Sequence, residues 1–407
     1  MRWRAFLTFA DVWLRTGWTV FAGMLGALIA VGGLISGSTP LTTGGLLLAV
    51  VATLATASDL IHVRREMSDL YIQPTNIDWL ALSLDPPYDS DELLEMRHGA
   101  ALLDDARCER LATLTRLPVK MCADEYRLPR IVSWALNKAI VEAWRSGRRD
   151  FDAPKVRLMS DLNPVEVDPP PVELQKTRFV FAGITNDLAA RAYRSRRERV
   201  ERLGPTSVPF PEMRLPDLGH SLCSNHVGVD TLVFLRTGHL VLGVQSAHNA
   251  QSPGLLSASG SGSSDWNDLI SLARPDFLAF LKRAMCRELR EECGVSTQQV
   301  DEQGTIIVGF ARLLHRGGKP QFFGWTPAAI TEHDVHRSQV EKRYVDDHLF
   351  VPLDWSSPID WSRSLRNFLQ REEAWLSAPL HLNVELLVRW AERDPARWDE
   401  IRASTSP

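Results

Sequence analysis

The sequence predicts an α+β fold, with an N-terminal two-helix transmembrane hairpin, then a helical middle region and an α/β/α sandwich. A run of 43 residues, 16–58, contains no Asp, Glu, Lys, Arg or His. An amphipathic helical pattern at residues 275–294 ends in several glutamates and lies between strand-like segments. The 407 residues are enough for more than one domain. We expect domains at 1–69, 70–172 and 173–407.

The uncharged run divides into two apolar stretches, 18–35 and 43–60, of which the second extends two residues past the run; Gly37 and Pro40 lie in the turn between them. About 20 residues of helix cross the hydrocarbon core of a bilayer. The turn is uncharged, whereas both outer ends carry arginines: Arg2, Arg4 and Arg15 before the first stretch, and Arg64 and Arg65 after the second. The positive-inside rule therefore places both ends in the cytoplasm and makes the lipid bilayer a partner.

Other interpretations of this run stay open. It could hold a signal peptide, with Ala55–Ala57 as the cleavage site, or a hairpin buried in a soluble core. Small residues also recur at every fourth position, a spacing that lets helices approach closely. They pack the hairpin against itself or drive self-association between copies. These residues are Ala22, Gly26 and Ala30 in the first stretch and Gly45, Ala49 and Thr53 in the second.

Composition excludes some classes of partner and site. The net charge of −4 and the pI near 6.3 give no electrostatic reason to expect a DNA or RNA duplex as the main partner. The five cysteines are scattered and form no CxxC pair. This pattern argues against a disulfide scaffold or a structural zinc site.

The middle of the chain is informative mainly about organisation. Residues 129–145 have the apolar spacing of an amphipathic helix, and residues 168–171 (Asp-Pro-Pro-Pro) are typical of a semi-rigid linker. The basic run at 194–199 fits either a solvated helix face with Arg/Glu pairs or a contact to phosphates. After residue 354, apolar residues at helical spacing predict packed C-terminal helices.

The strongest local signal lies at residues 287–295, Arg-Glu-Leu-Arg-Glu-Glu-Cys-Gly-Val. On a helix, Glu288, Glu291 and Glu292 share one side, and Gly294 is suited to end the helix in a left-handed cap. Three adjacent carboxylates need positive charge nearby, and Mg²⁺ or Mn²⁺ is a natural choice. Alternatively, Arg287 and Arg290 neutralise these glutamates on a solvated face.

These nine residues match R-E-U-x-E-E-x-G-U, where U is aliphatic, and so resemble the second half of the Nudix box. Strand-like segments at 231–236 and 239–244 precede the helix, and others at 305–314 and 321–326 follow it. This order is similar to that of the Nudix α/β/α sandwich. The resemblance implies a catalytic set of Arg287, Glu288, Glu291 and Glu292. It also implies that Glu288, Glu291 and Glu292 are ligands of Mg²⁺ or Mn²⁺.

The first half of the box departs from the family pattern. Ala273 and Ala279 stand where the family has Gly and Glu. Gly260 and Gly262, in a Ser/Gly-rich segment at 257–264, come about ten residues too early. This segment is either a flexible surface loop or a loop that approaches phosphates. The carboxylates that could replace the missing Glu are Asp265, Asp268 and Asp276.

The domain order resembles the two-transmembrane, SMODS-associated Nudix effectors of bacterial CBASS antiphage systems. This resemblance implies a protein of the bacterial inner membrane that senses a cyclic di- or oligonucleotide and self-associates to disrupt the membrane. The sequence does not identify nucleotide-binding residues. The alternatives are a membrane-anchored, Mg²⁺-dependent Nudix hydrolase of nucleoside diphosphate derivatives and a non-catalytic scaffold.

Overall fold

The chain forms two compact units, residues 1–73 with 192–202 and residues 74–191 with 203–407. The computed structural model describes residues 17–133, 135–136, 153–162, 169–247, 252–336 and 345–405, except for the side chains of 17–23 and 55–68. The predicted helix at 129–145 lies largely outside these ranges. Its described part is α5 (Arg130–Ser133) and residues 135–136. Asp168 of the predicted linker also lies outside them.

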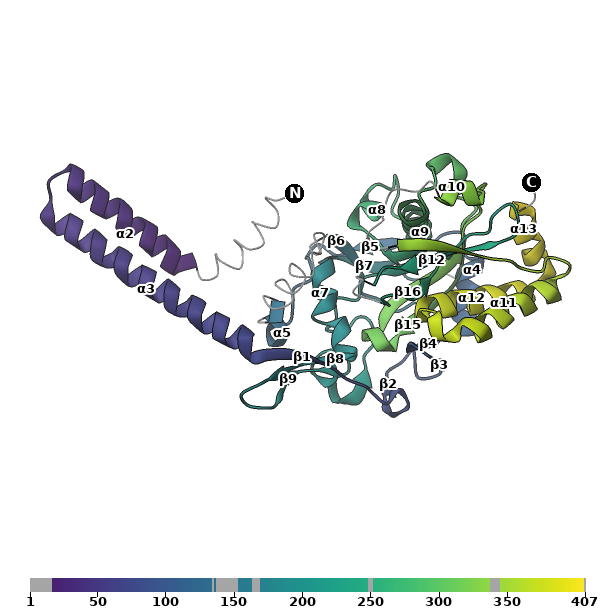
Figure 1. Cartoon of the computed structure of the whole chain (residues 1–407), viewed down its shortest axis with the longest axis horizontal. Helices are drawn as coiled ribbons and strands as arrows, with labels where there is room; N and C mark the ends of the chain where they lie inside the picture. The colour runs from purple at the N-terminus through teal and green to yellow at the C-terminus, as the bar shows by residue number, and fades with distance from the viewer. Residues whose placement is uncertain are drawn as a thin grey trace. The chain divides into compact units, whose positions relative to one another are not determined.

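The first unit begins with a helical hairpin of α2 (Gly17–Ile35) and α3 (Thr39–Asp69), drawn in purple and blue in Figure 1. Glycines let the two backbones touch. A Cβ on Gly26 would lie 2.6 Å from the backbone nitrogen of Ala49, and one on Gly45 would lie 2.3 Å from that of Ala30. At these positions the recurring small residues therefore pack the hairpin against itself.

The predicted transmembrane hairpin is wrong. Among the described residues, no helix has both the length and the apolar character needed to cross a bilayer. Nine of the 19 residues of α2 are Gly, Ala or Thr, whose side chains are small. Helix α3 continues past the apolar stretch into charged residues and ends at Asp69. The expected multi-pass localisation in the bacterial inner membrane depends on this hairpin and is therefore also not supported.

The first unit also contains a small sheet in the order β1-β8-β9. Its strands are β1 (Leu70–Pro74), β8 (Arg191–Ser195) and β9 (Glu201–Leu203). Asp69 accepts hydrogen bonds from Ser195 Oγ at 2.5 Å and from the backbone N–H of Arg197 at 2.9 Å. The basic run at 194–199 therefore ends a strand and forms a turn, so the predicted helix face is wrong.

The second unit is built on a six-stranded sheet in the order β14-β11-β16-β15-β4-β3. Strands β11 and β16 run parallel, and the other neighbours are antiparallel. The strands are β3 (Glu92–Met96), β4 (Gly99–Leu103), β11 (Gly228–Leu232), β14 (Gly260–Ser263), β15 (Ile306–Leu313) and β16 (Lys319–Trp325).

Helices cover both faces of this sheet (Figure 1). Helix α9 (Phe277–Cys293) packs on β14, β11 and β15, and α12 (Ala378–Glu392) packs on β11, β15 and β16. Neighbouring residues of β16 face opposite cores, because side chains alternate along a strand. Phe322 belongs to the core under α9, whereas Phe323 belongs to the core under α12. The second unit is therefore a three-layer α/β/α arrangement.

Smaller elements complete the second unit. Three further sheets have the orders β13-β12-β17, β5-β7-β6 and β10-β2. Their strands are β2 (Ser83–Leu84), β5 (Val119–Met121), β6 (Pro154–Leu158), β7 (Val172–Arg178), β10 (Arg214–Leu215), β12 (Leu240–Gln245), β13 (Leu256–Ser257) and β17 (Val345–Val351). The remaining α-helices are α4 (Asp105–Thr113), α7 (Phe179–Gly183), α8 (Trp266–Ile270), α10 (Glu332–His336), α11 (Pro358–Glu372) and α13 (Pro395–Thr405). Short 3₁₀ turns are Trp79–Ala81, Asn186–Ala189, Pro205–Ser207, Pro211–Met213, Thr297–Gln299, Leu314–Arg316 and Glu373–Trp375.

The helical middle region is a second error of the predicted fold class. Its described part holds several strands, and β3 and β4 extend the six-stranded sheet beside β15. Because of this pairing, the second compact unit runs across the predicted boundary at residue 172. The helices after residue 354 agree with the structure, which has α11, α12 and α13 there.

Candidate functional site

Helix α9 places the motif glutamates at the edge of the core. Asp276 caps its first turn by accepting a hydrogen bond from the N–H of Ala279 at 2.9 Å. Gly294 ends it in the left-handed conformation, with φ of 67°. Glu288 and Glu292 are each only 7% exposed, whereas the Glu291 side chain is 38% exposed.

Strand β14 lies directly against this helix because two of its residues are glycines. A Cβ on Gly260 would lie 2.5 Å from the backbone nitrogen of Leu289. A Cβ on Gly262 would lie 2.3 Å from Oε1 of Glu288. This part of the Ser/Gly-rich segment is thus a strand packed against α9, not a flexible surface loop.

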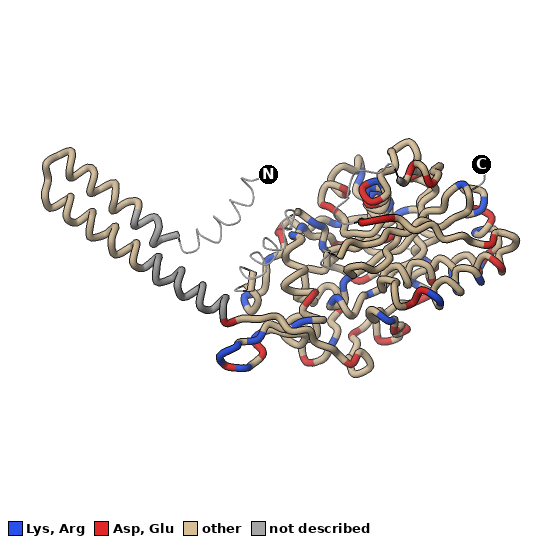
Figure 2. The backbone as a smooth tube through the Cα atoms, in the orientation of Figure 1, with Lys and Arg blue, Asp and Glu red and all other residues tan. Residues whose placement is uncertain are grey.

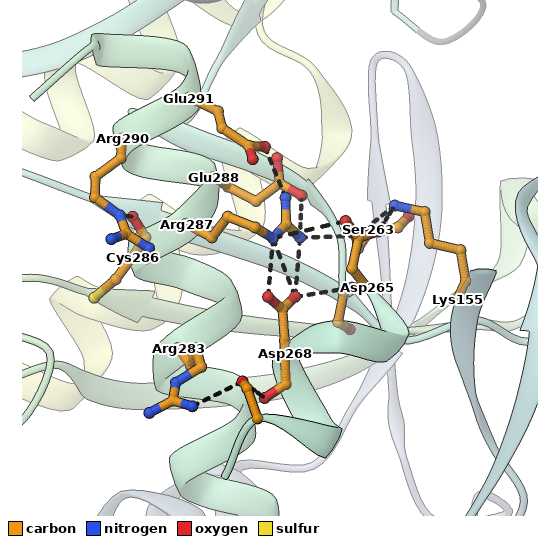
Figure 3. A network of polar contacts seen from close by, with 12 residues as sticks. Lys155, Ser263, Asp265, Asp268, Arg283, Cys286, Arg287, Glu288, Arg290 and Glu291 are labelled. Atoms are coloured by element: carbon orange, nitrogen blue, oxygen red, sulfur yellow. Dashed lines mark hydrogen bonds and ion pairs between the residues drawn. The ribbon is translucent and has the colours of Figure 1, made fainter. Parts of the chain in front are cut away.

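Arg287 lies at the centre of the motif's polar contacts (Figure 3). Its Nη1 is 2.8 Å from Glu291 Oε2, and its Nη2 is 2.9 Å from Glu288 Oε1. Its Nε donates to Asp268 Oδ1 at 3.0 Å, and Nη2 also donates to the carbonyl of Ser263 at 3.2 Å. One guanidinium therefore directly contacts the carboxylates of Glu288, Glu291 and Asp268, and a fourth, that of Asp265, lies 3.9 Å away.

The three candidate replacement carboxylates have different roles. Asp276 caps α9 and also accepts from the N–H of Leu117 at 3.0 Å. Asp268 binds Arg287 and closes the capping box of α8, accepting from the N–H of Asp265 at 2.8 Å. Asp265 bonds more closely to Lys155, with 2.5 Å between Oδ1 and Nζ, whereas its Oδ2 lies 3.9 Å from Arg287 Nε. Asp268 is thus the carboxylate that binds the motif arginine.

Lys155 is a site residue that sequence reasoning missed. It comes from β6, and its Nζ donates to Asp265 and to the carbonyl of Ser263, the latter at 2.9 Å. The residue is only 9% exposed. The Ser263 carbonyl therefore receives N–H donors from both Lys155 and Arg287. The available signal was a basic residue alternating with apolar ones in Pro154–Leu158.

The other two residues of the motif contact the protein elsewhere. Glu292 Oε2 accepts a hydrogen bond from the backbone N–H of Ser261 at 2.9 Å. Arg290 donates to the carbonyl of Cys286 and to Thr297 Oγ1.

Burial raises the pKa of Glu288, while the nearby charges of Arg287 and Lys155 oppose that rise. Glu288 is therefore more easily protonated than an exposed glutamate.

The expected Mg²⁺ or Mn²⁺ does not fit this arrangement as it stands. Divalent cations of this kind need several converging oxygen ligands. Within the described ranges, no group of three or more Asp, Glu, His or Cys residues has the geometry to hold a metal ion. Glu288 and Glu291 lie against a guanidinium, and Asp265 lies against an ammonium. The metal stays a prediction.

A separate pocket of about 560 Å³ lies along the same strand, β6. It is lined chiefly by polar and charged residues, among them Tyr126, Arg157, Gln175 and His220. Arg157 is 5% exposed, and its guanidinium carbon lies 4.8 Å from the centre of the Tyr126 ring. Residues 155 and 157 project to the same side of β6, because side chains alternate along a strand.

The second unit is thus a layered α/β domain with a charged network on its central helix. The chain matches no known protein family and no curated protein. Part of it is similar to a crystal structure of DR0079 from Deinococcus radiodurans, with 13% identity and a TM-score of 0.27. That similarity covers 39% of this chain and 81% of DR0079. A similarity this weak does not establish a shared fold or function.

Proposed function

We propose that this chain is a receptor of a bacterial antiphage signalling system, whose second unit binds a cyclic oligonucleotide without hydrolysing it. The main support for the proposal is that a donor group of the protein itself binds each of the three motif glutamates. Arg287 binds Glu288 and Glu291, and the N–H of Ser261 binds Glu292. Metal-assisted hydrolysis needs carboxylates that are free to hold the cation. A receptor has no such need, and slow turnover preserves its signal.

The helical hairpin of the first unit supplies the response in this proposal, through self-association. Between residues 24 and 54, α2 and α3 carry no charged residue, and this part of the hairpin is tan in Figure 2. Large apolar side chains on both helices face outward: Met24 is 67% exposed, Leu28 69% and Leu47 66%. Contiguous exposed apolar surface of this kind favours protein association. Packing between copies would cover it.

The test measures binding and turnover in the same sample. The full chain is titrated with a panel of cyclic di- and trinucleotides by calorimetry, with Mg²⁺ and then with a chelator. Each nucleotide is afterwards recovered and analysed by chromatography. We expect one member to bind with the same affinity in both conditions and to be recovered intact. Metal-dependent cleavage that is lost in Glu291→Gln would overturn the proposal in favour of the hydrolase.

Self-association is tested by sedimentation velocity with and without the bound nucleotide. Ligand shifts such an equilibrium only if it binds one assembly state more tightly than the other. We expect larger species when the nucleotide is present. A charged variant of the outward face, Leu28→Glu with Leu47→Glu, should stay small under the same conditions. An unchanged, monomeric profile for the wild-type chain contradicts this part of the proposal.

A further inference from the structure

The pocket beside β6 contains a buried cation without an acidic partner. Arg157 donates from Nε to the carbonyl of Cys223 at 3.1 Å and from Nη2 to the carbonyl of Ser221 at 2.6 Å. Nη1 donates to Gln175 Oε1 at 2.9 Å and also contacts the sulfur of Met159. All of these acceptors are neutral. No carboxylate among the described residues forms an ion pair with this guanidinium.

This arrangement is unusual for a buried charge. Burying a cation has a free-energy cost of several kcal/mol unless an opposite charge compensates it. Arg107, at 4% exposed, shows the ordinary solution, with 2.8 Å between its Nη1 and Asp91 Oδ2. Burial lowers the pKa of Arg157. Burial acts in the same direction on Arg107, but there Asp91 outweighs it and the pKa is raised.

Arg157 also keeps hydrogen-bonding capacity. A guanidinium has five N–H donors, and the contacts described above use four of them. One N–H on Nη2 has no acceptor among the described residues. Because Arg157 lines an open pocket, a ligand that enters the pocket can approach this donor. The ligand that best satisfies both the charge and the donor is an anion with accepting oxygens.

The other charges of the pocket permit an anion to enter. Arg127 and His220 also line it, and a hydrogen bond to Asp217 raises the pKa of His220, which favours its cationic form. Two carboxylates line the same pocket. Glu125 is paired with Lys176, with 2.5 Å between Oε1 and Nζ. Asp124 is the second, and the lining also contains Arg127, Arg157 and His220.

We propose that this pocket binds a phosphate group, with Arg157 as its main cation and Arg127 and His220 at its entrance. This inference rests on the proposed function in one respect, namely that the phosphate belongs to the nucleotide signal. Ligand pockets commonly enclose 300–1,000 Å³. The volume of about 560 Å³ therefore suits one nucleotide unit of a cyclic oligonucleotide.

The test uses inorganic pyrophosphate and cyclic dinucleotides as probes of the full chain, by calorimetry. We expect wild-type protein to bind pyrophosphate and Arg157→Gln to lose at least about tenfold in affinity, since hydrogen bonds to charged groups contribute about 1.5–3 kcal/mol. Circular dichroism shows whether Arg157→Gln folds. The exposed Arg127→Glu reverses an entrance charge without disturbing the core and should also weaken binding. Arg274→Glu, an exposed residue outside the pocket, serves as the matched control.

Hydrogen exchange locates the bound probe. Pyrophosphate should slow exchange in residues 124–127 and 219–222, which line the pocket. Equal affinity of wild type, Arg157→Gln and Arg127→Glu for pyrophosphate overturns the assignment. A cyclic dinucleotide that binds all three equally overturns the pocket but leaves the receptor function standing. Pyrophosphate binding that depends on Arg157, without binding of any cyclic nucleotide, supports the pocket and overturns the receptor function.

Discussion

The ammonium of Lys155 lies 2.5 Å from the carboxylate of Asp265. Lys155 belongs to β6, which is far in sequence from the segment that contains the motif. Its second hydrogen bond goes to the carbonyl of Ser263, which Arg287 also binds. A cation of the protein thus contacts two oxygens beside Glu288. Lysine is compact and singly charged, and here it is the cation closest to the Asp265 carboxylate.

Replacing Lys155 should therefore create affinity for a divalent cation. Lys155→Met keeps the length of the side chain but releases Asp265 Oδ1 and the Ser263 carbonyl, both hard oxygen ligands. We expect Mn²⁺ binding, followed by electron paramagnetic resonance, to increase at least tenfold over wild type. Lys120→Met is the matched control, because Lys120 forms an exposed ion pair with Glu173, which is not a residue of the motif. Equally tight binding by wild type would contradict the role given to Lys155.

Arg287 should be important for stability as well as for the site. Arg287→Met leaves the buried carboxylates of Asp268 and Glu288 without their partner. Breaking a buried ion pair costs about 3–5 kcal/mol, and we expect a loss at the lower end of this range in urea unfolding. The double variant Arg287→Met with Asp268→Asn should recover part of it. Arg283→Met removes a partly exposed pair with Glu302 and an exposed hydrogen bond to Ser271 Oγ, and it should cost less than about 1 kcal/mol.

Anion affinity of the pocket should fall as the pH rises. The hydrogen bond to Asp217 raises the pKa of His220 above 6.5, and the charges of Asp161 and Asp85 act in the same direction. The imidazolium that attracts an anion is present below this raised pKa and is lost as the pH passes through it. Titration with sulfate, whose charge is constant over the range, should show the decline. His220→Gln should bind more weakly and without this pH dependence.

Two glycines of the hairpin should respond oppositely to alanine. In Gly26→Ala the new Cβ would lie 2.6 Å from the backbone nitrogen of Ala49, so α2 and α3 must move apart. We expect a loss of about 1–3 kcal/mol, seen as faster proteolysis of the hairpin. Nothing lies within 4 Å of a Cβ on Gly32. Gly32→Ala should stabilise the helix by up to about 1 kcal/mol.

Local patterns predicted the elements that depend on local chemistry. The apolar spacing of 275–294 and the glycine at 294 match α9 and its left-handed cap. The strand-like segments at 305–314 and 321–326 match β15 and β16, which pair as antiparallel strands on either side of Gly317 and Gly318. In each case the deciding contacts are only a few residues apart, so periodicity and turn chemistry are sufficient.

Contacts between distant segments were not predictable in this way. Lys155 reaches Asp265 only because β6 lies beside the segment before α8, a fact that no local pattern contains. Only the contacts seen in the structure distinguish the roles of Asp265, Asp268 and Asp276. The uncharged run also did not show where the second helix ends. Helix α3 continues past the run into charged residues and ends at Asp69.

Strand β6 connects the two regions in which we expect function. One edge pairs with β7, and the other makes single bridges from Lys155 to Asp265 and from Arg157 to His226. The two basic residues are two positions apart, about 6.6 Å along the strand. The contact of Lys155 with the motif and the proposed phosphate contact of Arg157 therefore depend on the placement of the same short strand.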